Sequence, residues 1–422
     1  MFENRDEAVY YIENIKRKEK RINLNRMLMA LQMLGNPQNS YKVIHVAGTN
    51  GKGSTVAYLT NILYTAGFNV GSFISPYVIT FNERIMCNLS YISDDDLVKY
   101  ANIVYQVKQD LEQKDEVITF FEFITLMGLL YFKDKKVDYA VVEVGLGGIL
   151  DATNVFEHAT RVITNIGFDH MNALGSTLRE IAQKKLGIVH QNENVITAVD
   201  ESLLDDFKSY TKNLNSKLFW VNNSVEDIKE DFNGTSFKFN NEVYKTPLLG
   251  KFQAYNASCA IKALNLCEPE ISKEEIQKGL LNTIWPGRLQ VIKKNPTILI
   301  DGGHNIHGVD AVVKSIKGLT NKKIHILFTA LKDKEIDKMI KSLDEIASDY
   351  IFTTISDARA CSVSDIISST NRPFKIIEKY TEALDYINQI YNGDDIILMT
   401  GSLHFISQII NFYQKNEKNQ KK

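Results

Sequence analysis

A chain of 422 residues is longer than a single hydrophobic core usually supports, so we expect more than one domain. Its 49 basic and 51 acidic residues give a net charge of −2, which leaves no basic surplus for a nucleic-acid partner. No run approaches the ~18 apolar residues that span a bilayer, and no apolar stretch follows the charged N-terminal residues, so we expect a cytoplasmic protein without a membrane partner. The four cysteines are scattered without a C-x-x-C pair, which excludes the usual zinc and disulfide patterns.

The first half of the chain predicts helices and then an alternation of strands and helices. Residues 6–34 carry apolar residues on one helical face, and the pattern stops at residues 35–37, Gly-Asn-Pro. Two short strands at 41–47 and 70–74 flank a helix at 54–66, which indicates a βαβ unit with parallel strands. Further apolar runs predict strands at 137–144, 161–166 and 193–198.

The second half predicts a change of domain. Residues 236–244 indicate an antiparallel hairpin, a helix is expected at 256–266, and the polar residues 293–296 indicate a linker. After the linker, strands are expected at 297–301, 324–328, 350–353, 374–377 and 395–399. The predicted fold class is therefore α/β, with a P-loop parallel-sheet ATPase domain at 1–292 and a smaller Rossmann-like α/β domain at 297–422.

The strongest local motif is Gly48-Thr49-Asn50-Gly51-Lys52-Gly53-Ser54, between a strand and a helix. Glycines let successive N–H groups point into one cavity, the helix N-terminus adds partial positive charge, and Lys52 can reach the outer phosphates of a nucleotide. A turn that needs glycine only for its conformation is the alternative. Gly53 stands where the standard motif has its magnesium-binding hydroxyl, so a metal must find other ligands.

Oxygen and nitrogen donors follow the predicted strands. Ser75 comes after the second strand, Glu143 lies at the end of the third, and Asp169-His170 follow the fourth. Parallel strands end at one edge of a sheet, where open α/β folds bind ligands, so we expect these side chains to converge beside the phosphate loop.

Two further segments carry polar groups. Residues 145–148 and 150–154 form a glycine-rich loop that is either a surface turn or a functional loop, and the residues do not decide between these. Asp301 directly follows a strand, where a carboxylate often accepts hydrogen bonds from ribose hydroxyls, and Arg288 precedes the predicted linker, where it could clamp phosphates.

Together these motifs resemble the folylpolyglutamate synthase/dihydrofolate synthase family of the Mur ligase superfamily. The resemblance runs from about residue 22 to residue 404. It is carried by segments 48–54, 75–76, 81–85, 119–123, 144–148, 150–154, 167–170 and 301–305.

The resemblance implies an ATP-dependent amide ligase. ATP phosphorylates the carboxylate of the substrate, the amine of glutamate attacks the acyl phosphate, and phosphate leaves. The implied substrates are a reduced folate and L-glutamate, the implied cofactors are ATP, two Mg²⁺ ions and K⁺, and the implied assembly is a monomer.

The resemblance also assigns roles to residues, position by position. Catalysis is assigned to Lys52, His170 and Lys185. Nucleotide binding is assigned to Gly51, Lys52, Gly53, Ser54, Asn256, Arg288, Asp301 and His304. Metal binding is assigned to Ser75, Glu143, His170 and Lys185, the last as a carbamate, because an unmodified ammonium would repel the metal. From the residues alone, Lys185 reads as an exposed helix lysine. Substrate contacts are assigned to Leu150, Asp151, Ala152 and Thr153.

The sequence departs from the family pattern at several positions. The family usually has other residues at six positions, which are occupied here by Asn23, Tyr77, Ile149, Lys184, Leu186 and Phe252. Most of them fall on the pterin side, so they count more against use of dihydropteroate than against ATP chemistry. The alternatives are another Mur-type ligase, such as a cell-wall precursor ligase, a P-loop phosphotransferase and a catalytically silent ATP-binding module.

Overall fold

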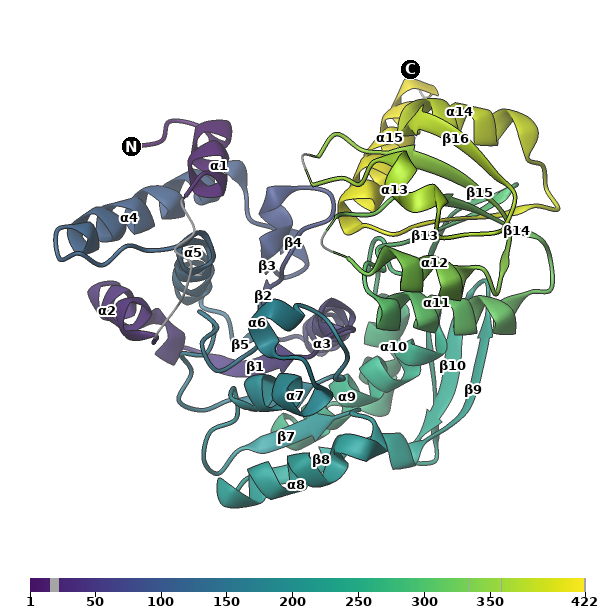
Figure 1. Ribbon diagram of the computed structural model, residues 1–422. Helices are drawn as coiled ribbons and strands as arrows, with labels where there is room; N and C mark the ends of the chain where they lie inside the picture. The colour runs from purple at the N-terminus through teal and green to yellow at the C-terminus, as the bar shows by residue number, and fades with distance from the viewer. Residues whose placement is uncertain (16–22, 333, 358, 421–422) are drawn as a thin grey trace. The chain divides into compact units, whose positions relative to one another are not determined.

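The computed structural model describes residues 1–15, 23–332, 334–357 and 359–420, and the chain divides into two compact units (Figure 1). The first unit comprises Met1–Val225, Phe239–Asn241 and Tyr255–Thr283. The second comprises Glu226–Lys238, Glu242–Ala254 and Ile284–Lys422. The predicted α/β class, with a parallel sheet in the first part and a second α/β part, is confirmed.

The first unit is built on a sheet with the strand order β4-β3-β2-β5-β1-β6-β7-β8. The neighbours from β2 to β8 pair in parallel, while β3 and β4 form an antiparallel edge. The strands are β1 Lys42–Ala47, β2 Val70–Phe73, β3 Ile85–Cys87, β4 Ser90–Tyr91, β5 Tyr139–Glu143, β6 Thr160–Ile163, β7 Asn194–Thr197 and β8 Lys217–Trp220. The strands predicted in this half are confirmed, and the helix predicted at 54–66 lies between β1 and β2.

Helices cover both faces of this sheet. They are α1 Arg5–Glu13, α2 Asn25–Met33, α3 Lys52–Thr65, α4 Asp94–Glu112, α5 Phe120–Asp134, α6 Met171–Leu174, α7 Leu178–Leu186, α8 Leu204–Asn213, α9 Lys251–Cys267 and α10 Lys273–Leu281. Short 3₁₀ helices lie at Pro37–Asn39, Phe81–Arg84, Glu201–Leu203 and Asn222–Ser224. Part of the stretch predicted as helical at 6–34, residues 16–22, lies outside the described residues.

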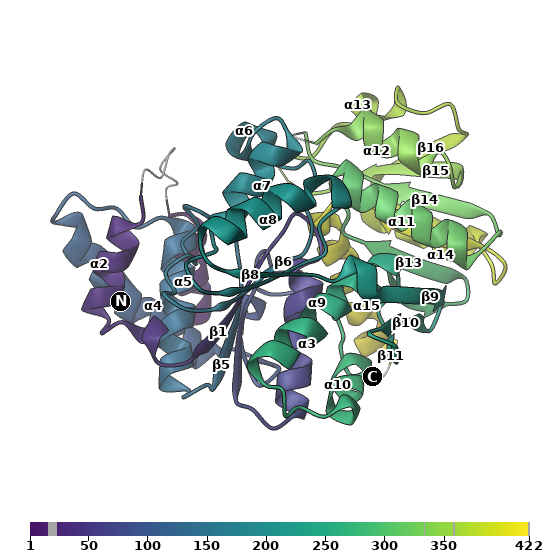
Figure 2. The same ribbon diagram turned by 90° about the horizontal axis from the view of Figure 1, so that it is seen from below.

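Two apolar clusters lie on one face of the sheet. In the first, α1, α2, α4 and α5 pack on Phe73, Ala140 and Val142, and in the second, α7 and α8 pack on Ile163 and Val195. Helix α3 packs on β1, β2 and β5, and α10 packs on α3; Figure 2 shows α3, α9 and α10 side by side. Capping boxes at Thr119 and Thr177 start α5 and α7, so polar side chains fix where both helices begin.

The second unit contains two sheets. One has the order β11-β10-β9 and the other the order β12-β13-β17-β14-β15-β16. Its strands are β9 Val225–Asp231, β10 Gly234–Phe239, β11 Glu242–Thr246, β12 Gln290–Lys294, β13 Thr297–Asp301, β14 Ile324–Phe328, β15 Ala347–Thr354, β16 Phe374–Lys379 and β17 Ile396–Thr400. Its helices are α11 Ile306–Leu319, α12 Ile336–Leu343, α13 Val363–Ile367, α14 Tyr380–Ile390 and α15 Leu403–Gln420. Apolar residues from α11, α12, β14 and β17 form its core.

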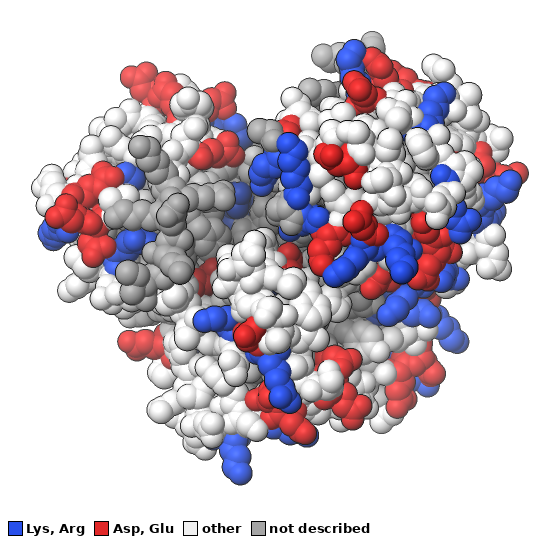
Figure 3. All heavy atoms as spheres, in the orientation of Figure 1, with Lys and Arg blue, Asp and Glu red and all other residues white. Residues whose placement is uncertain are grey.

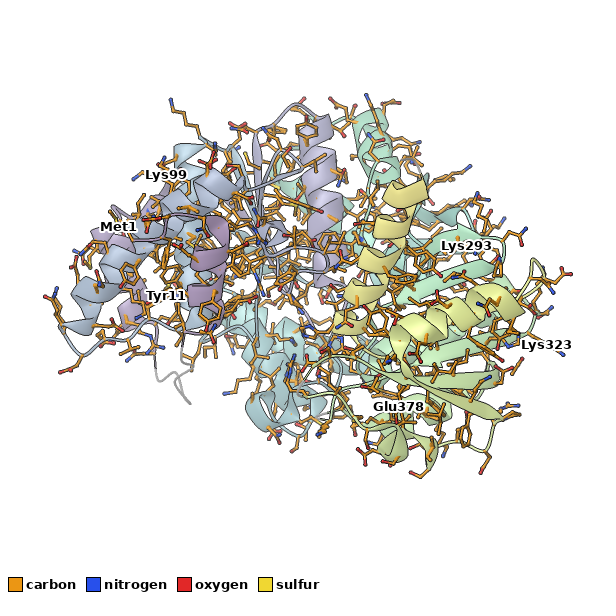
Figure 4. The ribbon with its side chains drawn as sticks, turned by 90° about the horizontal axis from the view of Figure 1, so that it is seen from above. Met1, Tyr11, Lys99, Lys293, Lys323 and Glu378 are labelled. Carbon is orange, nitrogen blue, oxygen red and sulfur yellow. The ribbon has the colours of Figure 1, made fainter. Side chains whose placement is uncertain are left out.

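The prediction of a linker at residues 293–296 was wrong. Strands β12 and β13 pair antiparallel around this turn, so it is a hairpin inside the second sheet. Figure 4 labels a residue on each edge strand of that sheet, Lys293 on β12 and Glu378 on β16. The predicted hairpin at 236–244 is confirmed as β10 and β11, but β9 was missed. Most of residues 226–254 belong to the second unit, which is a further difference from the division predicted at 292–297.

The surface carries both signs of charge. Acidic and basic side chains are interspersed over the face shown in Figure 3, in keeping with the net charge of −2. Among the described residues, no helix combines the length and the apolar character that crossing a bilayer requires.

Candidate active site

Two residues of the loop between β1 and α3 have backbone conformations and close neighbours that only glycine permits. Gly48 has φ 148° and Gly51 has φ 81°. A Cβ on Gly48 would lie 1.9 Å from Thr164 Oγ1, and one on Gly51 would lie 2.3 Å from Asn256 Oδ1. Thr164 in turn donates a hydrogen bond of 2.6 Å to the carbonyl oxygen of Asn50. Close packing against β6 and α9 therefore fixes the loop, and Asn256 lies against the residue that starts α3.

Backbone groups anchor the same loop from the segment after β6. The amide of Thr49 donates to Asn165 O at 2.9 Å, and the amide of Asn50 donates to Asn165 Oδ1 at 2.9 Å. The Thr49 hydroxyl accepts from Gly167 N at 2.9 Å. Helix α3 starts at Lys52, directly after this loop, and a glycine-rich loop followed by a helix N-terminus is the arrangement that binds phosphate in strand–loop–helix motifs.

Lys52 lies folded over this loop. Its Nζ donates to the carbonyl oxygens of Gly48 and Thr49, both at 3.2 Å, and lies 3.9 Å from Glu143 Oε1. Glu143 is buried at the end of β5, and its other carboxylate oxygen accepts from the amide of Ser75 at 3.2 Å. The predicted convergence of strand ends therefore holds for β1, β2 and β5.

Lys185 is buried, with only 5% of the residue exposed. Its Nζ donates a hydrogen bond of 2.7 Å to the carbonyl oxygen of Gly48. Burial, with a smaller contribution from the charge of Lys52, lowers its pKa to about 7, while Asp169 and Asp151 act in the opposite direction. The expectation of an exposed helix lysine was wrong, because α7 turns this residue toward the phosphate loop.

His170 lies at the start of α6 with φ 49°, and its side chain is 48% exposed. Its amide donates to Asp169 Oδ1 at 2.9 Å. In the part of the chain that the structure describes, no group of three or more His, Cys, Asp or Glu residues lies close enough to hold a metal ion. Ser75 and Glu143, which are in contact, supply the kind of oxygen donors that suit Mg²⁺, because this ion is commonly held by one or two carboxylates together with substrate phosphates.

The loop predicted to contact the substrate is largely buried. Asp151, Ala152 and Thr153 are each at most 2% exposed, whereas Leu150 is 37% exposed. Asp151 Oδ2 accepts from the amide of Leu146 at 2.8 Å, and Oδ1 accepts from the amide and the hydroxyl of Thr153 at 3.0 and 2.6 Å. The buried side chains thus shape the loop, and its exposed apolar residues are Leu146, Ile149 and Leu150.

The candidate nucleotide residues of the second unit form a group of their own. Asp301, at the end of β13, is buried and accepts from the amides of Leu289 and Gly303, both at 2.7 Å. Burial raises the pKa of its carboxyl group, and the charge of Arg288 opposes that shift. His304 Nδ1 lies 3.0 Å from Gly302 O. The antiparallel pairing of β12 with β13 thus brings Arg288, just before β12, close to Asp301 at the end of β13 and to His304 before α11.

A buried polar network, which the sequence patterns did not predict, lies beneath the site. It contains His45 on β1, Arg161 on β6 and Glu193 before β7. The available signal was the presence of ionisable residues inside otherwise apolar strands. A pocket of about 620 Å³ lies elsewhere, at the far end of α3, where it is lined by Tyr64, Phe68 and Lys278 among others.

Two family models and several known proteins match this chain over most of its length. Residues 46–264 match the Mur ligase middle domain, and residues 287–403 match the Mur ligase glutamate ligase domain. A dihydrofolate synthase/folylpolyglutamate synthase of Bacillus subtilis is 38% identical over 92% of this chain and 94% of its own. A folylpolyglutamate synthase of Lacticaseibacillus casei is 33% identical over 96% of this chain and 98% of its own. The structure of a Mycobacterium tuberculosis folylpolyglutamate synthase complexed with ADP superposes with a TM-score of 0.89, at 25% identity, over 97% of this chain and 98% of its own.

Proposed function

Because the chain belongs to the folylpolyglutamate synthase/dihydrofolate synthase family of the Mur ligases, and is thus an ATP-dependent ligase, we propose that it adds L-glutamate to the γ-carboxylate of a reduced folate. The observation that carries the proposal is the meeting of Lys52, Lys185 and the Gly48 carbonyl beside Glu143. Lys52 as a cation, and Glu143 as a carboxylate that can bind a metal ion, suit a reaction that must bring two anions together. The phosphotransferase alternative fits the two matching ligase domains less well.

We propose that the phosphate loop positions ATP, which supplies the phosphoryl group that turns the folate carboxylate into an acyl phosphate. Gly51, Gly53 and Ser54 hold phosphate oxygens through the start of α3. Lys52 gives up its contacts with the loop carbonyls, and its ammonium then neutralises the outer phosphate. Ser75, Glu143 and His170 hold the first Mg²⁺.

We propose that Lys185 serves the second Mg²⁺ as a carbamate. A pKa near 7 leaves a large fraction of the amine neutral at physiological pH, so its nitrogen lone pair can attack dissolved CO₂. An N–C bond forms, one proton leaves the nitrogen, and the product is an anion where the ammonium was a cation. The remaining N–H can keep the hydrogen bond to Gly48 O. The presence of K⁺ as a third cation is part of the same proposal.

The nucleotide contacts proposed in the second unit are Arg288, Asp301 and His304. Asp301 still has acceptor capacity after its two backbone bonds, as a ribose hydroxyl requires. If this role is right, Arg288→Ala raises the KM for ATP and leaves the KM for folate nearly unchanged. Equal effects on both substrates would contradict it.

The folate is proposed to meet the loop at residues 145–150, whose exposed apolar side chains suit an aromatic ring system. Dihydrofolate synthesis is the second candidate activity, and it is favoured by the name of the Bacillus subtilis relative, which carries both activities. Ile149, which is 47% exposed, stands on this loop where the resemblance leads us to expect an arginine, and this favours the folate substrate over dihydropteroate.

The experiment is incorporation of labelled glutamate with ATP, Mg²⁺ and K⁺, on tetrahydrofolate and on dihydropteroate in parallel. Incorporation on tetrahydrofolate alone supports the proposal, and incorporation on both adds the second activity. Lys52→Ala, which removes the proposed phosphate contact, is the matched control and should abolish both. Absence of incorporation on either substrate, with ATP still bound, would overturn the folate assignment. Light scattering of the same sample tests the proposed monomer.

A further inference from the structure

The buried network begins at Arg161, which is fully buried on β6. Its Nε donates to Glu193 Oε2 and its NH2 to Glu193 Oε1, both at 2.8 Å, and NH2 also donates to Phe156 O at 2.9 Å. The bidentate partner balances the buried charge. Its NH1 donates to Nδ1 of His45, 2.8 Å away on the neighbouring strand.

Because arginine can only donate, its contact with His45 fixes which atom donates and which accepts in each following hydrogen bond of the network. A guanidinium has donors and no acceptor, so His45 Nδ1 must accept, and the ring proton must lie on Nε2. Nε2 lies 2.8 Å from Thr153 Oγ1, which accepts that proton's hydrogen bond. The Thr153 hydroxyl then points its own hydrogen at Asp151 Oδ1, 2.6 Å away. Burial and the charge of Arg161 lower the pKa of His45 well below its usual range, in keeping with a neutral ring of one tautomer.

The network ends at the loop proposed to meet the folate. Asp151 holds the amide of Leu146 at 2.8 Å. Ile149 N donates to Lys184 O at 3.1 Å, and a Cβ on Gly148 would lie 2.9 Å from Lys185 O. The loop is therefore in close contact with the last turn of α7, which carries Lys185, and its shape depends on the hydrogen bonds of Asp151 as well as on that contact.

We propose that His45 is a positioning residue: Arg161 holds it in the Nε2–H tautomer, and through Thr153 and Asp151 it sets the shape of the 145–150 loop for the folate substrate. The inference rests on the proposed function for its substrate, but its structural part does not. It accounts for the presence of a histidine, with one donor and one acceptor, between an arginine and a hydroxyl.

Two isosteric variants separate positioning from bulk stability. His45→Gln places an amide N–H near the Nε2 position and keeps the donor to Thr153, whereas His45→Asn keeps only an acceptor for Arg161. We expect His45→Asn to raise the KM for folate about tenfold or more, with the KM for ATP within about twofold, and His45→Gln to stay near the wild type. Thr153→Ser and Thr153→Val should divide in the same way. Equal losses within each pair would overturn the proposal.

The tautomer can be measured without any activity. In protein labelled with ¹⁵N at its eight histidines, His45 should show a protonated Nε2 and an unprotonated Nδ1, with the signal assigned by its loss in His45→Gln. A charged ring or a protonated Nδ1 would overturn the proposal whatever the kinetic constants of the variants. If the tautomer is as expected and the wild type incorporates no glutamate, the proposed function fails and the network stands.

Discussion

The side-chain nitrogens of Lys52 and Lys185 both donate to the carbonyl oxygen of Gly48, at 3.2 and 2.7 Å. One lysine comes from the phosphate loop's own helix, and the other comes from α7, more than 130 residues later in the chain. Burial is the main cause of the lowered pKa of Lys185, and repulsion by the nearby ammonium of Lys52 lowers it further. The shared carbonyl thus links the lysine proposed to bind phosphate to the lysine proposed to become an anion.

Replacement of Lys185 by Ala should lower glutamate incorporation by about two orders of magnitude, because a ligand of the proposed second Mg²⁺ is lost. Acetate or formate at high concentration should restore part of that rate by supplying a carboxylate in the vacated space. Lys184→Ala, which alters the exposed neighbour, is the control and should stay near the wild type. Full activity of Lys185→Ala would remove this residue from the mechanism.

The lowered pKa of Lys185 also predicts a dependence of stability on pH. In the unfolded chain the amine has its ordinary pKa of 10.5, whereas burial lowers it to about 7 in the folded protein. As the pH falls from 10.5 to 7, the unfolded chain takes up a proton that the folded protein does not, so the folded state loses stability across this window. Below about pH 7 the loss is complete.

Lys185→Met removes this loss, so the free energy of unfolding of the variant relative to wild type should rise as the pH is lowered. Between about pH 9.5 and pH 6.5 the relative gain should be on the order of 3 kcal/mol. The measurement is urea unfolding without bicarbonate, Mg²⁺ or nucleotide, and Lys184→Met is the control. A difference that does not change with pH would show that Lys185 keeps its ordinary pKa.

Gly51 and Gly67 both have left-handed backbones. A comparison of their alanine variants therefore separates the effect of backbone strain from the effect of a displaced phosphate loop. At Gly51, φ is 81° and a Cβ would collide with Asn256; at Gly67, φ is 90° and no atom lies within 4 Å of a Cβ. Both changes to Ala should cost about 1 kcal/mol in backbone strain. Only Gly51→Ala should raise the KM for ATP, by about tenfold or more, because its loop must shift. If Gly67→Ala raised the KM for ATP as much, strain alone would explain the effect.

Local patterns were sufficient to predict the phosphate loop and the strand ends. Gly48 and Gly51 lie between an apolar run and a helical pattern, and Ser75 and Glu143 lie where apolar runs stop, so the sheet's topology brings them together. The role of each residue in ATP and metal binding stays a prediction.

The remaining features depend on long-range packing, which a local pattern does not contain. Lys184 and Lys185 are alike in sequence, and only the packing of α7 on Ala47 and Val144 decides which of them is buried. The polar turn at 293–296 has the composition of a linker, but its flanking strands pair with each other and β13 pairs with β17. His45 and Arg161 meet because β1 and β6 are neighbours in the sheet, although 116 residues separate them.

His325, at the start of β14, provides a pH-dependent contact in the second unit. Its Nδ1 lies 2.8 Å from Asp349 Oδ2, and its Nε2 lies 3.4 Å from Asp395 Oδ1. The ring of Tyr391 packs on it with the ring centroids 4.2 Å apart and the planes tilted by 35°. Burial alone would lower the pKa of His325, but the hydrogen bond and charge of Asp349, followed by Asp395, outweigh it and raise the pKa. The folded state therefore binds this proton more tightly than the unfolded chain. The resulting stability is fully present below about pH 6.5 and is lost as the pH rises through the folded-state pKa.

His325→Gln should lower the free energy of unfolding by on the order of 1 kcal/mol near pH 6 and by less near pH 8.5. The measurement is thermal unfolding at both pH values, with His158→Gln, a change to an exposed histidine of the first unit, as the control. An equal loss at both pH values would mean that the ring acts through packing with Tyr391 and not through its charge.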